Sequence, residues 1–306
     1  MSKKVAIILL NWNTPDYTAS CISSIMKYCT ADDYDLIIAD NGSTDNSLAI
    51  LKAAFPQHIY IDNRINLGFA GGNNTALKYS IDNGYEFSLL LNNDTETEED
   101  FLTPLLSHLD KNKNVVAVQP AIYYLGNKEQ LWNGGSYFNP YFGITYSNNS
   151  KARQQLDTPE KVDWLTGCCL LVRNEALKKI GLLNEKFFLY YEDVELSFRL
   201  KAECGELYYI PTTKIYHEAG VSGKFKSANP EGTLSPIIHY YLSRNKIWFL
   251  RKYANPFFAI LIFLINTFYY GAVFCYLIIR GRNKKVMYLY KGIKEGLFTS
   301  KSMIWP

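Results

Sequence analysis

Three carboxylates lie within four consecutive positions of the sequence, at Glu192, Asp193 and Glu195. They follow an aromatic run and begin a segment with helical periodicity. Carboxylates this close repel one another, and the repulsion raises their affinity for a proton. The pattern is typical of a general base, although an acidic first turn that stabilises a helix through its dipole would have the same composition.

Two further polar motifs follow apolar runs that have the composition of buried strands. Asp40-Asn41-Gly42-Ser43-Thr44-Asp45 follows residues 36–39, and Asn92-Asn93-Asp94 follows residues 89–91. A carboxylate at the end of a strand can accept a hydrogen bond from a nucleobase or a ribose. A divalent cation on a diphosphate needs only one or two protein oxygens, because the phosphates supply others. Asp94 fits that role, whereas the first motif could also be a plain strand–turn–helix connector.

A glycine-rich stretch and a single histidine complete the candidate residues. Residues 66–74 read Asn-Leu-Gly-Phe-Ala-Gly-Gly-Asn-Asn, and glycines before a helix allow backbone N–H groups to approach a phosphate. The stretch is not the GxGxxG pattern of nicotinamide-binding folds, and a tight structural turn is the alternative. His217 could be a metal ligand, although a lone histidine is more often structural.

Strand and helix patterns alternate through the first part of the chain, which predicts an α/β fold with a parallel sheet covered on both faces. Ligands of such sheets bind outside the carboxyl ends of the strands, where the polar motifs fall. The predicted strands are residues 5–10, 36–39, 58–61, 87–91 and 115–118, and the predicted helices are residues 17–28, 46–55, 71–83, 98–111 and 193–202.

Composition limits the class of protein and its location. The net charge of +3 is weak and dispersed, so nucleic acid is not an expected partner. The six cysteines form no CxxC pair, which argues against a zinc site and a disulfide framework. The apolar run at residues 5–10 is too short for a signal peptide, so we expect the catalytic part in the cytosol.

The C-terminal part has a different composition. Residues 256–279 carry no charge, and as a helix this stretch would span about 36 Å at ~1.5 Å per residue. Basic residues flank it on both sides, which argues against a simple crossing and favours a surface helix or a re-entrant hairpin at the membrane. A buried core helix and a homodimer interface are the alternatives.

The order and spacing of these motifs resemble those of the family 2 glycosyltransferases of the GT-A fold, and within them the rhamnosyltransferase-like branch. The matching segments fall between about residues 4 and 220 and read DNGSTDNS, NLGFAGGNN, LNNDT, DWLTGCCLLVR, FFLYYEDVELSFRL and KIYHEAG. The resemblance implies a Rossmann-like mixed sheet with helices on both faces in a catalytic domain at residues 1–235. Membrane-associated helices would occupy residues 236–306.

The resemblance also implies a reaction and its residues. The enzyme would invert configuration in a single in-line displacement, using a UDP- or dTDP-sugar, Mg²⁺ or Mn²⁺, and a lipid-linked or glycan acceptor. Asp193 would be the base supported by Glu192, and Asp94 and His217 would hold the metal. The nucleotide-sugar would contact Asn11, Asn13, Asp40, Asn41, Gly68, Asn73 and Asn93, and the acceptor would lie by Trp164, Thr166 and Gly167.

One departure from the family pattern and three alternatives remain. The metal motif reads Asn92-Asn93-Asp94 instead of Asp-x-Asp, so metal binding would be weaker. A sugar-phosphate nucleotidyltransferase would carry a Gly- and Arg-rich signature where Asn11-Trp12-Asn13-Thr14 stands, and a processive synthase would carry a Gln-x-x-Arg-Trp motif. A non-catalytic sugar-nucleotide-binding or membrane scaffold protein is the alternative from another class.

Overall fold

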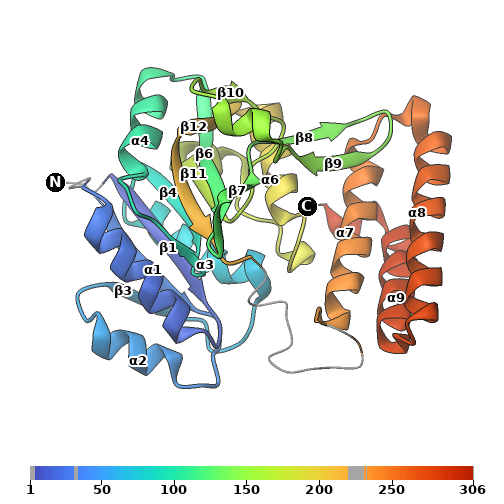
Figure 1. Ribbon diagram of the computed structural model, residues 1–306, viewed down its shortest axis with the longest axis horizontal. Helices are drawn as coiled ribbons and strands as arrows, with labels where there is room; N and C mark the ends of the chain where they lie inside the picture. Colours follow the sequence, from blue (N-terminus) through green and yellow to red (C-terminus); the bar gives the residue numbers. More distant parts are fainter. Residues whose placement is uncertain (1–3, 31–33, 220–230, 232, 306) are drawn as a thin grey trace. The chain divides into compact units, whose positions relative to one another are not determined.

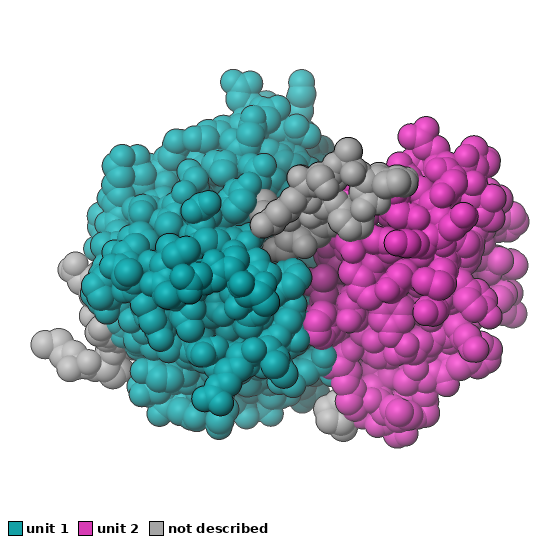
Figure 2. Space-filling model, turned by 90° about the horizontal axis from the view of Figure 1, so that it is seen from below, with its two compact units in different colours: residues 1–137, 146–185, 192–219 teal, residues 138–145, 186–191, 220–306 magenta. Residues whose placement is uncertain are grey.

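The computed structural model describes residues 4–30, 34–219, 231 and 233–305. The chain divides into two compact units, which Figure 2 shows in different colours. The first unit holds residues 1–137, 146–185 and 192–219, and the second holds residues 138–145, 186–191 and 220–306. The assignment of a catalytic domain to residues 1–235 and a membrane region to residues 236–306 stays a prediction.

A mixed β-sheet forms the centre of the first unit (Figure 1). β1 (Val5–Asn11) lies between β2 (Tyr34–Asp40) and β4 (Phe87–Asn92), parallel to both, and β3 (Ile59–Asp62) extends the sheet beyond β2. These four strands and β6 (Val115–Tyr124) were predicted from their apolar runs. The carboxyl ends of β1, β2 and β4 therefore meet at one edge of the sheet.

The other half of the sheet contains antiparallel pairs, which the strand patterns did not predict. β11 (Cys169–Arg173) is antiparallel to both β4 and β6 (Val115–Tyr124), and β12 (Glu206–His217) is parallel to β6. A strand buried on both faces is apolar whichever way it runs, so its composition carries no information about direction. The mixed sheet that the family resemblance implied is confirmed.

Helices cover both faces of this sheet. Ile7 and Leu9 pack in one cluster with residues of α1 (Pro15–Tyr28), α2 (Ser47–Ala54) and α4 (Leu102–Lys111). Ala6 and Ile8 pack in a second cluster with residues of α3 (Gly68–Asp82), α5 (Asn174–Ile180) and α6 (Glu192–Glu203). Successive side chains of a strand point to opposite faces, so β1 must be apolar throughout to serve both clusters.

Two helices, α3 and α4, begin three or four residues from the predicted positions, whereas α1, α2 and α6 begin within two residues of them. α4 begins at Leu102 instead of residue 98, because the Asp100 side chain accepts hydrogen bonds from the N–H groups of Leu102 and Thr103 and caps the helix there. α3 begins at Gly68 instead of residue 71, so the glycines expected before the helix lie inside its first turns.

The second unit is mostly helical. It contains α7 (Pro236–Tyr253), α8 (Ala259–Ile279), α9 (Asn283–Phe298) and α10 (Lys301–Ile304). α7 and α9 approach closely at Gly292, which has no Cβ atom. A Cβ atom there would collide with Ser243 and the Tyr240 backbone. The remaining short elements of both units are β5 (Thr95–Glu96), β7 (Asn127–Asn133), β8 (Ser136–Asn139), β9 (Ile144–Ser147), β10 (Glu160–Lys161) and the 3-10 turns Lys151–Gln155, Glu185–Phe187 and Pro256–Phe258.

Candidate active site

A buried chain of hydrogen bonds joins the ends of β1, β2 and β4. The Asn93 amide donates to Thr18 Oγ1 over 2.8 Å, and this hydroxyl donates to Asn11 Oδ1 over 2.8 Å. The Asn11 amide in turn donates to Asp40 Oδ2 over 2.8 Å. The strand register, with Asn11 opposite Asp40 and Leu10 opposite Asn92, makes this geometry possible. Three of the predicted nucleotide-contacting residues are therefore held in one network.

A second set of bonds fixes the loops after β1 and β2. Asp40 Oδ1 accepts the backbone N–H of Ser43 over 2.9 Å, and Ser43 Oγ accepts the backbone N–H of Asn13 over 2.9 Å. The Asn13 side chain accepts the N–H of Thr44 over 2.7 Å while its own backbone has a φ of 56°. The two loops thus form one rigid edge around the Asp40 carboxylate. The nucleotide-binding role of Asn11, Asn13 and Asp40 stays a prediction.

The glycine-rich stretch packs against the same edge. The Asn41 amide donates to Gly68 O and to Asn66 Oδ1, both over 3.1 Å. A Cβ atom at Gly72 would lie 2.7 Å from Leu10 Cδ1 and 2.9 Å from Asn41 Oδ1, so this glycine allows α3 to contact β1. The Asn73 amide donates back to Phe69 O within the helix. The glycines inside α3 therefore serve close packing, and the phosphate-binding role of Gly68 and Asn73 remains untested.

Asp94 and His217 come together at the end of β12. β12 pairs with β5 in a register that places His217 opposite Thr95. His217 Nε2 consequently lies 3.1 Å from Asp94 Oδ1 and 3.3 Å from the Asn92 amide nitrogen. The Trp132 ring packs edge-on against the imidazole, with 4.7 Å between centroids. Gly220, the last residue of the KIYHEAG motif, lies outside the described residues.

This pair fits the donor set of a divalent cation on a diphosphate. Among the described residues no three His, Cys, Asp or Glu side chains gather as a metal site. A cation that carries a diphosphate needs only one or two protein ligands, and one oxygen with one imidazole nitrogen satisfies that need. His217 is 4% exposed, and its Nδ1 has no hydrogen-bond partner in the described part of the chain. Nε2, and not this unpartnered Nδ1, is the ring nitrogen that lies beside Asp94, so a cation shared with Asp94 would bind Nε2.

Glu192 and Asp193 begin α6, and their carboxylates are held differently. Asp193 Oδ2 accepts the backbone N–H of Gly167 over 2.9 Å, and its Oδ1 accepts the N–H of Val194 over 2.8 Å. Glu192 is 4% exposed, and its Oε2 finds no hydrogen-bond partner among the described residues. Glu195 is different again, because Arg199 binds both of its oxygens.

These surroundings separate the proton affinities of the two carboxylates. Burial, with the charge of Asp193 as a second cause, raises the pKa of Glu192 well above its usual range. Loss of hydration also raises the pKa of Asp193, while the N–H groups of Gly167 and Val194 oppose that rise. Glu192 therefore holds a proton at neutral pH more readily than Asp193. Charge repulsion was the cause expected from the sequence, and burial proves the larger one.

The predicted acceptor residues lie in the turn that leads into β11. Gly167 donates its N–H to Asp193, and a Cβ atom there would lie 3.0 Å from the Phe69 ring and 3.6 Å from Asp193 Cβ. The Thr166 N–H donates to Gln119 Oε1 over 3.0 Å, and the Trp164 indole donates to Tyr137 O over 3.1 Å. Thr166 and Gly167 are thus beside the predicted base, whereas the structure shows no such link for Trp164.

The buried thiol of Cys168 lies within electrostatic range of both predicted centres. Burial raises the pKa of Cys168, and the charges of Asp94 and Asp193 raise it further. The predicted base, Asp193, and the predicted metal ligand, Asp94, therefore both lie close to the turn that holds Cys168. Cys168 stays protonated and unreactive in this environment.

Four residues of the site escaped sequence analysis: Thr18, Phe69, Gln119 and Trp132. Gln119 is fully buried and also donates to Asn133 Oδ1 over 2.9 Å. Its polar side chain inside the apolar run of β6 was a signal that could have been used. Thr18, Phe69 and Trp132 have ordinary residue types for their elements, and only the fold brings them to the site.

The comparison with protein families identifies the class. A model of glycosyl transferase family 2 matches residues 6–181. The chain belongs to glycosyl transferase family 2, a family of enzymes, as the motifs predicted.

Relatives and solved structures agree with this assignment. The chain is 27% identical over 207 residues to the low-salt glycan biosynthesis hexosyltransferase Agl10 of Haloferax volcanii, covering 66% of this chain and 63% of that protein. It is 23% identical over 244 residues to the N-acetylglucosaminyl-diphospho-decaprenol L-rhamnosyltransferase of Mycobacterium tuberculosis, covering 73% of this chain and 79% of that protein. The structure of GalNAc-T7 with UDP, GalNAc and Mn²⁺ superposes with a TM-score of 0.58 at 14% identity, over 70% of this chain and 44% of the other. The chain thus spans less than two thirds of the Haloferax protein, and the third comparison concerns the fold alone.

Proposed function

We propose that the protein is an inverting glycosyltransferase of glycan biosynthesis, with Asp193 as its general base. The observation that carries this proposal is the setting of Asp193, whose two oxygens are fixed by the N–H groups of Gly167 and Val194. Its raised pKa makes it a better proton acceptor than an exposed aspartate. The backbone bonds fix its direction but leave lone pairs on both oxygens for an acceptor hydroxyl.

The reaction follows from the base and the donor edge. Asp193 takes the proton of the acceptor hydroxyl as its oxygen attacks the anomeric carbon, and the bond from that carbon to the diphosphate breaks in the same step. Burial raises the pKa of Glu192, so Glu192 holds a proton more readily than Asp193 and leaves Asp193 as the carboxylate that can accept the proton. One displacement inverts the anomeric configuration and needs no nucleophile from the protein.

Asp94 and His217 would hold the divalent cation, Mg²⁺ or Mn²⁺. Its charge would offset the negative charge that develops on the departing diphosphate. The 3.1 Å separation of Nε2 and Oδ1 supports this assignment, because one cation can bind two atoms that lie this close to each other. The single carboxylate of Asn92-Asn93-Asp94 agrees with a cation held largely by the donor.

The donor is a UDP- or dTDP-sugar, with rhamnose as the first candidate sugar, and the acceptor is lipid-linked or a growing glycan. The name of the Mycobacterium relative supports both the sugar and a lipid diphosphate acceptor. Asp40 and the network around Asn11 would meet the nucleoside, since they form the rigid edge outside the strands.

The second unit would attach the enzyme to the cytoplasmic face of a membrane. Residues Pro256–Ile279 have a mean hydropathy of 2.0 and are only 17% buried, and among the described residues this is the one helix long and apolar enough to cross a bilayer. Basic Arg280, Arg282 and Lys284 follow α8 directly, and α9 then packs back against it. This arrangement favours a helix lying in the membrane surface.

A donor screen tests the function. We expect the purified protein with Mn²⁺ to hydrolyse or transfer from one UDP- or dTDP-sugar and to be stabilised by it in a thermal shift. A non-catalytic scaffold would be stabilised by the nucleotide-sugar but would release no nucleoside diphosphate. A nucleotidyltransferase would instead release pyrophosphate from a nucleoside triphosphate and a sugar phosphate. Inversion is tested by the anomeric configuration of the product in an NMR spectrum.

A further inference from the structure

The segment Lys186–Tyr191, which leads directly into Glu192 and Asp193, has an unusual backbone. Phe188, Tyr190 and Tyr191 have φ angles of 62°, 69° and 69°. Residues other than glycine rarely adopt this left-handed region of backbone conformation. Three such residues within four positions cost conformational free energy. Strained conformations of this kind persist only where the surroundings fix them, and they cluster at functional sites.

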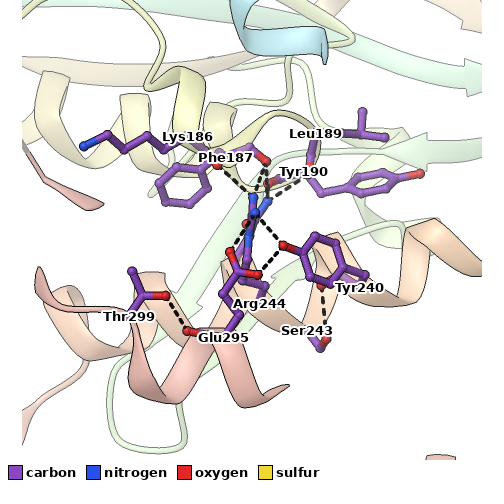
Figure 3. Close-up of polar contacts among 10 residues, drawn as sticks. Lys186, Phe187, Leu189, Tyr190, Tyr240, Ser243, Arg244, Glu295 and Thr299 are labelled. Atoms are coloured by element: carbon purple, nitrogen blue, oxygen red, sulfur yellow. Dashed lines mark hydrogen bonds and ion pairs between the residues drawn. The ribbon is translucent and has the colours of Figure 1, made fainter. Parts of the chain in front are cut away.

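Asn245 of α7 holds the backbone of this segment. Its amide nitrogen donates to the carbonyls of Phe187, Leu189 and Tyr190 over 2.8, 2.9 and 2.7 Å. Asn245 is fully buried, so these bonds do not compete with water. Figure 3 shows the carbonyls converging on this part of α7.

Arg244 makes a second set of contacts with the start of the segment. Its Nη2 donates to Lys186 O over 2.8 Å and to Phe187 O over 3.1 Å, and its Nε donates to Asn245 Oδ1 over 2.9 Å. The last bond orients the Asn245 amide so that its N–H groups face the carbonyls. The two residues therefore hold the segment together, because Arg244 fixes the orientation of the Asn245 amide.

Arg244 is itself fixed by α7 and α9. Arg244 is 6% exposed, and its guanidinium lies 4.2 Å from the Trp248 ring centroid. Its Nη1 donates to Tyr240 Oη over 3.1 Å and to Glu295 Oε1 over 3.3 Å. The Tyr240 hydroxyl also bonds to Glu295 (Figure 3). The segment is thus clamped by a helix pair whose own packing depends on Gly292 and Gly296.

We propose that Arg244 and Asn245 are positioning residues for the catalytic carboxylates, acting by imposing the left-handed backbone of Lys186–Tyr191 that sets where Glu192 and Asp193 emerge. The proposal rests on the proposed function, since it takes Asp193 as the base. Neither residue is required to touch the donor or the acceptor. They act through the backbone, because Tyr191 is bonded directly to Glu192. Loss of their hydrogen bonds should therefore lower the rate of transfer.

The test compares Asn245→Asp and Asn245→Ala with wild type in a steady-state transfer assay. Asn245→Asp keeps the size of the side chain but removes the N–H donors, and Asn245→Ala removes the amide. We expect kcat to fall about 10- to 100-fold and the KM for the donor to stay within about 2-fold, since the donor edge lies on β1, β2 and β4. Asn255→Ala is the matched control, because its amide serves only its own turn at Phe257, and it should leave kcat unchanged.

Two further measurements separate positioning from a general loss of structure. Arg244→Lys retains charge and most packing, so a folded variant is available even if Asn245→Ala unfolds. The acid limb of its kcat–pH profile should move, because Asp193 leaves the surroundings that raise its pKa. The double variant Asp193→Asn with Asn245→Asp should be no slower than Asp193→Asn alone, since both changes disable one base.

Specific results overturn the inference. Arg244 and Asn245 would have a purely structural role if the effects of the two changes multiplied in the double variant. The same would follow if the acid limb of folded Arg244→Lys did not move, or if donor affinity fell in parallel with kcat. If Asp193→Asn itself transfers sugar normally, the proposed base is wrong, which is a separate outcome from failure of the positioning proposal.

Discussion

His217 Nε2 and Asp94 Oδ1 lie 3.1 Å apart because the last residues of β12 pair antiparallel with β5. The two side chains come from motifs that are far apart in the sequence, LNNDT and KIYHEAG, so only the fold brings them together. Their meeting defines the point at which the diphosphate would be held. It also makes the metal assignment open to a direct test.

Replacing Asp94 with Asn should weaken Mn²⁺-dependent donor binding by at least ~10-fold, because no second carboxylate in that motif can replace it. His217→Ala should have a smaller effect, since imidazole would be one ligand among several. Calorimetric titration of the donor with and without Mn²⁺ measures this. Asp82→Asn, which alters only an exposed pair with Lys78, is the control. Unchanged Mn²⁺ dependence in Asp94→Asn would contradict the site.

Asp193→Asn should lower the transfer rate by ~10²–10⁴-fold while the donor affinity changes by no more than a few-fold. The amide keeps the shape of the side chain but cannot accept the proton. Glu192→Gln should be milder, because burial raises the pKa of Glu192 and an amide resembles the protonated form that this shift favours. Near-normal transfer by Asp193→Asn would move the base elsewhere. Glu195 would be a poor substitute, since Arg199 occupies it.

The stability of the protein should also depend on pH through Glu192. Burial raises its pKa in the folded state, so its contribution to stability is complete below the pKa of the unfolded chain and is lost as the pH rises through the folded value. Glu192→Gln removes that dependence. The variant should therefore gain stability relative to wild type as the pH rises from about 4 toward 8. Urea unfolding at both pH values measures the difference, and a constant difference would refute the burial argument.

Thr18→Val tests the network at the strand ends. Valine has the shape of threonine but no hydroxyl, so Asn93 loses an acceptor and Asn11 loses a donor at a fully buried position. We expect a loss of about 1–3 kcal/mol in the free energy of unfolding. Donor affinity should fall as well, since Asp40 is held through Asn11. A variant with lower stability but unchanged donor affinity would confine the network to a structural role.

The exposed face of α8 should carry the attachment to membranes. Ile260 and Phe268 are 79% and 78% exposed, so replacing both with Asn removes apolar surface without disturbing the core. With vesicles that contain an anionic phospholipid, the amount of this double variant that sediments should fall to the amount that sediments without vesicles. Ile65→Asn, at a 64% exposed position in the first unit, is the control.

The same variants distinguish the alternatives. Continued sedimentation of the double variant would show that α8 is not the membrane contact. If wild type is a dimer without vesicles and the variant a monomer, the face is covered by a second copy of the chain. Tyr270 is only 9% exposed and packs with Ile247 and Leu289, so substitution there is not informative.

The sequence by itself determined the strands of the first half and the family. Apolar runs such as residues 87–91 can only be buried, and a carboxylate or an amide directly after such a run must lie at the sheet edge. Local pattern and chain order were therefore enough to predict Asp40, Asp94 and Asp193 as candidate residues. The start of α4 required one more detail, the capping by Asp100.

The tertiary structure decided which of these residues meet and in what state. The direction of β11 and the pairing of β12 with β5 depend on contacts between distant segments, and no local pattern encodes them. Burial separates the proton affinities of Glu192 and Asp193, although the two are adjacent in the sequence. The hold of Asn245 on Lys186–Tyr191 is of the same kind, because a buried amide has meaning only once the fold has placed three carbonyls around it.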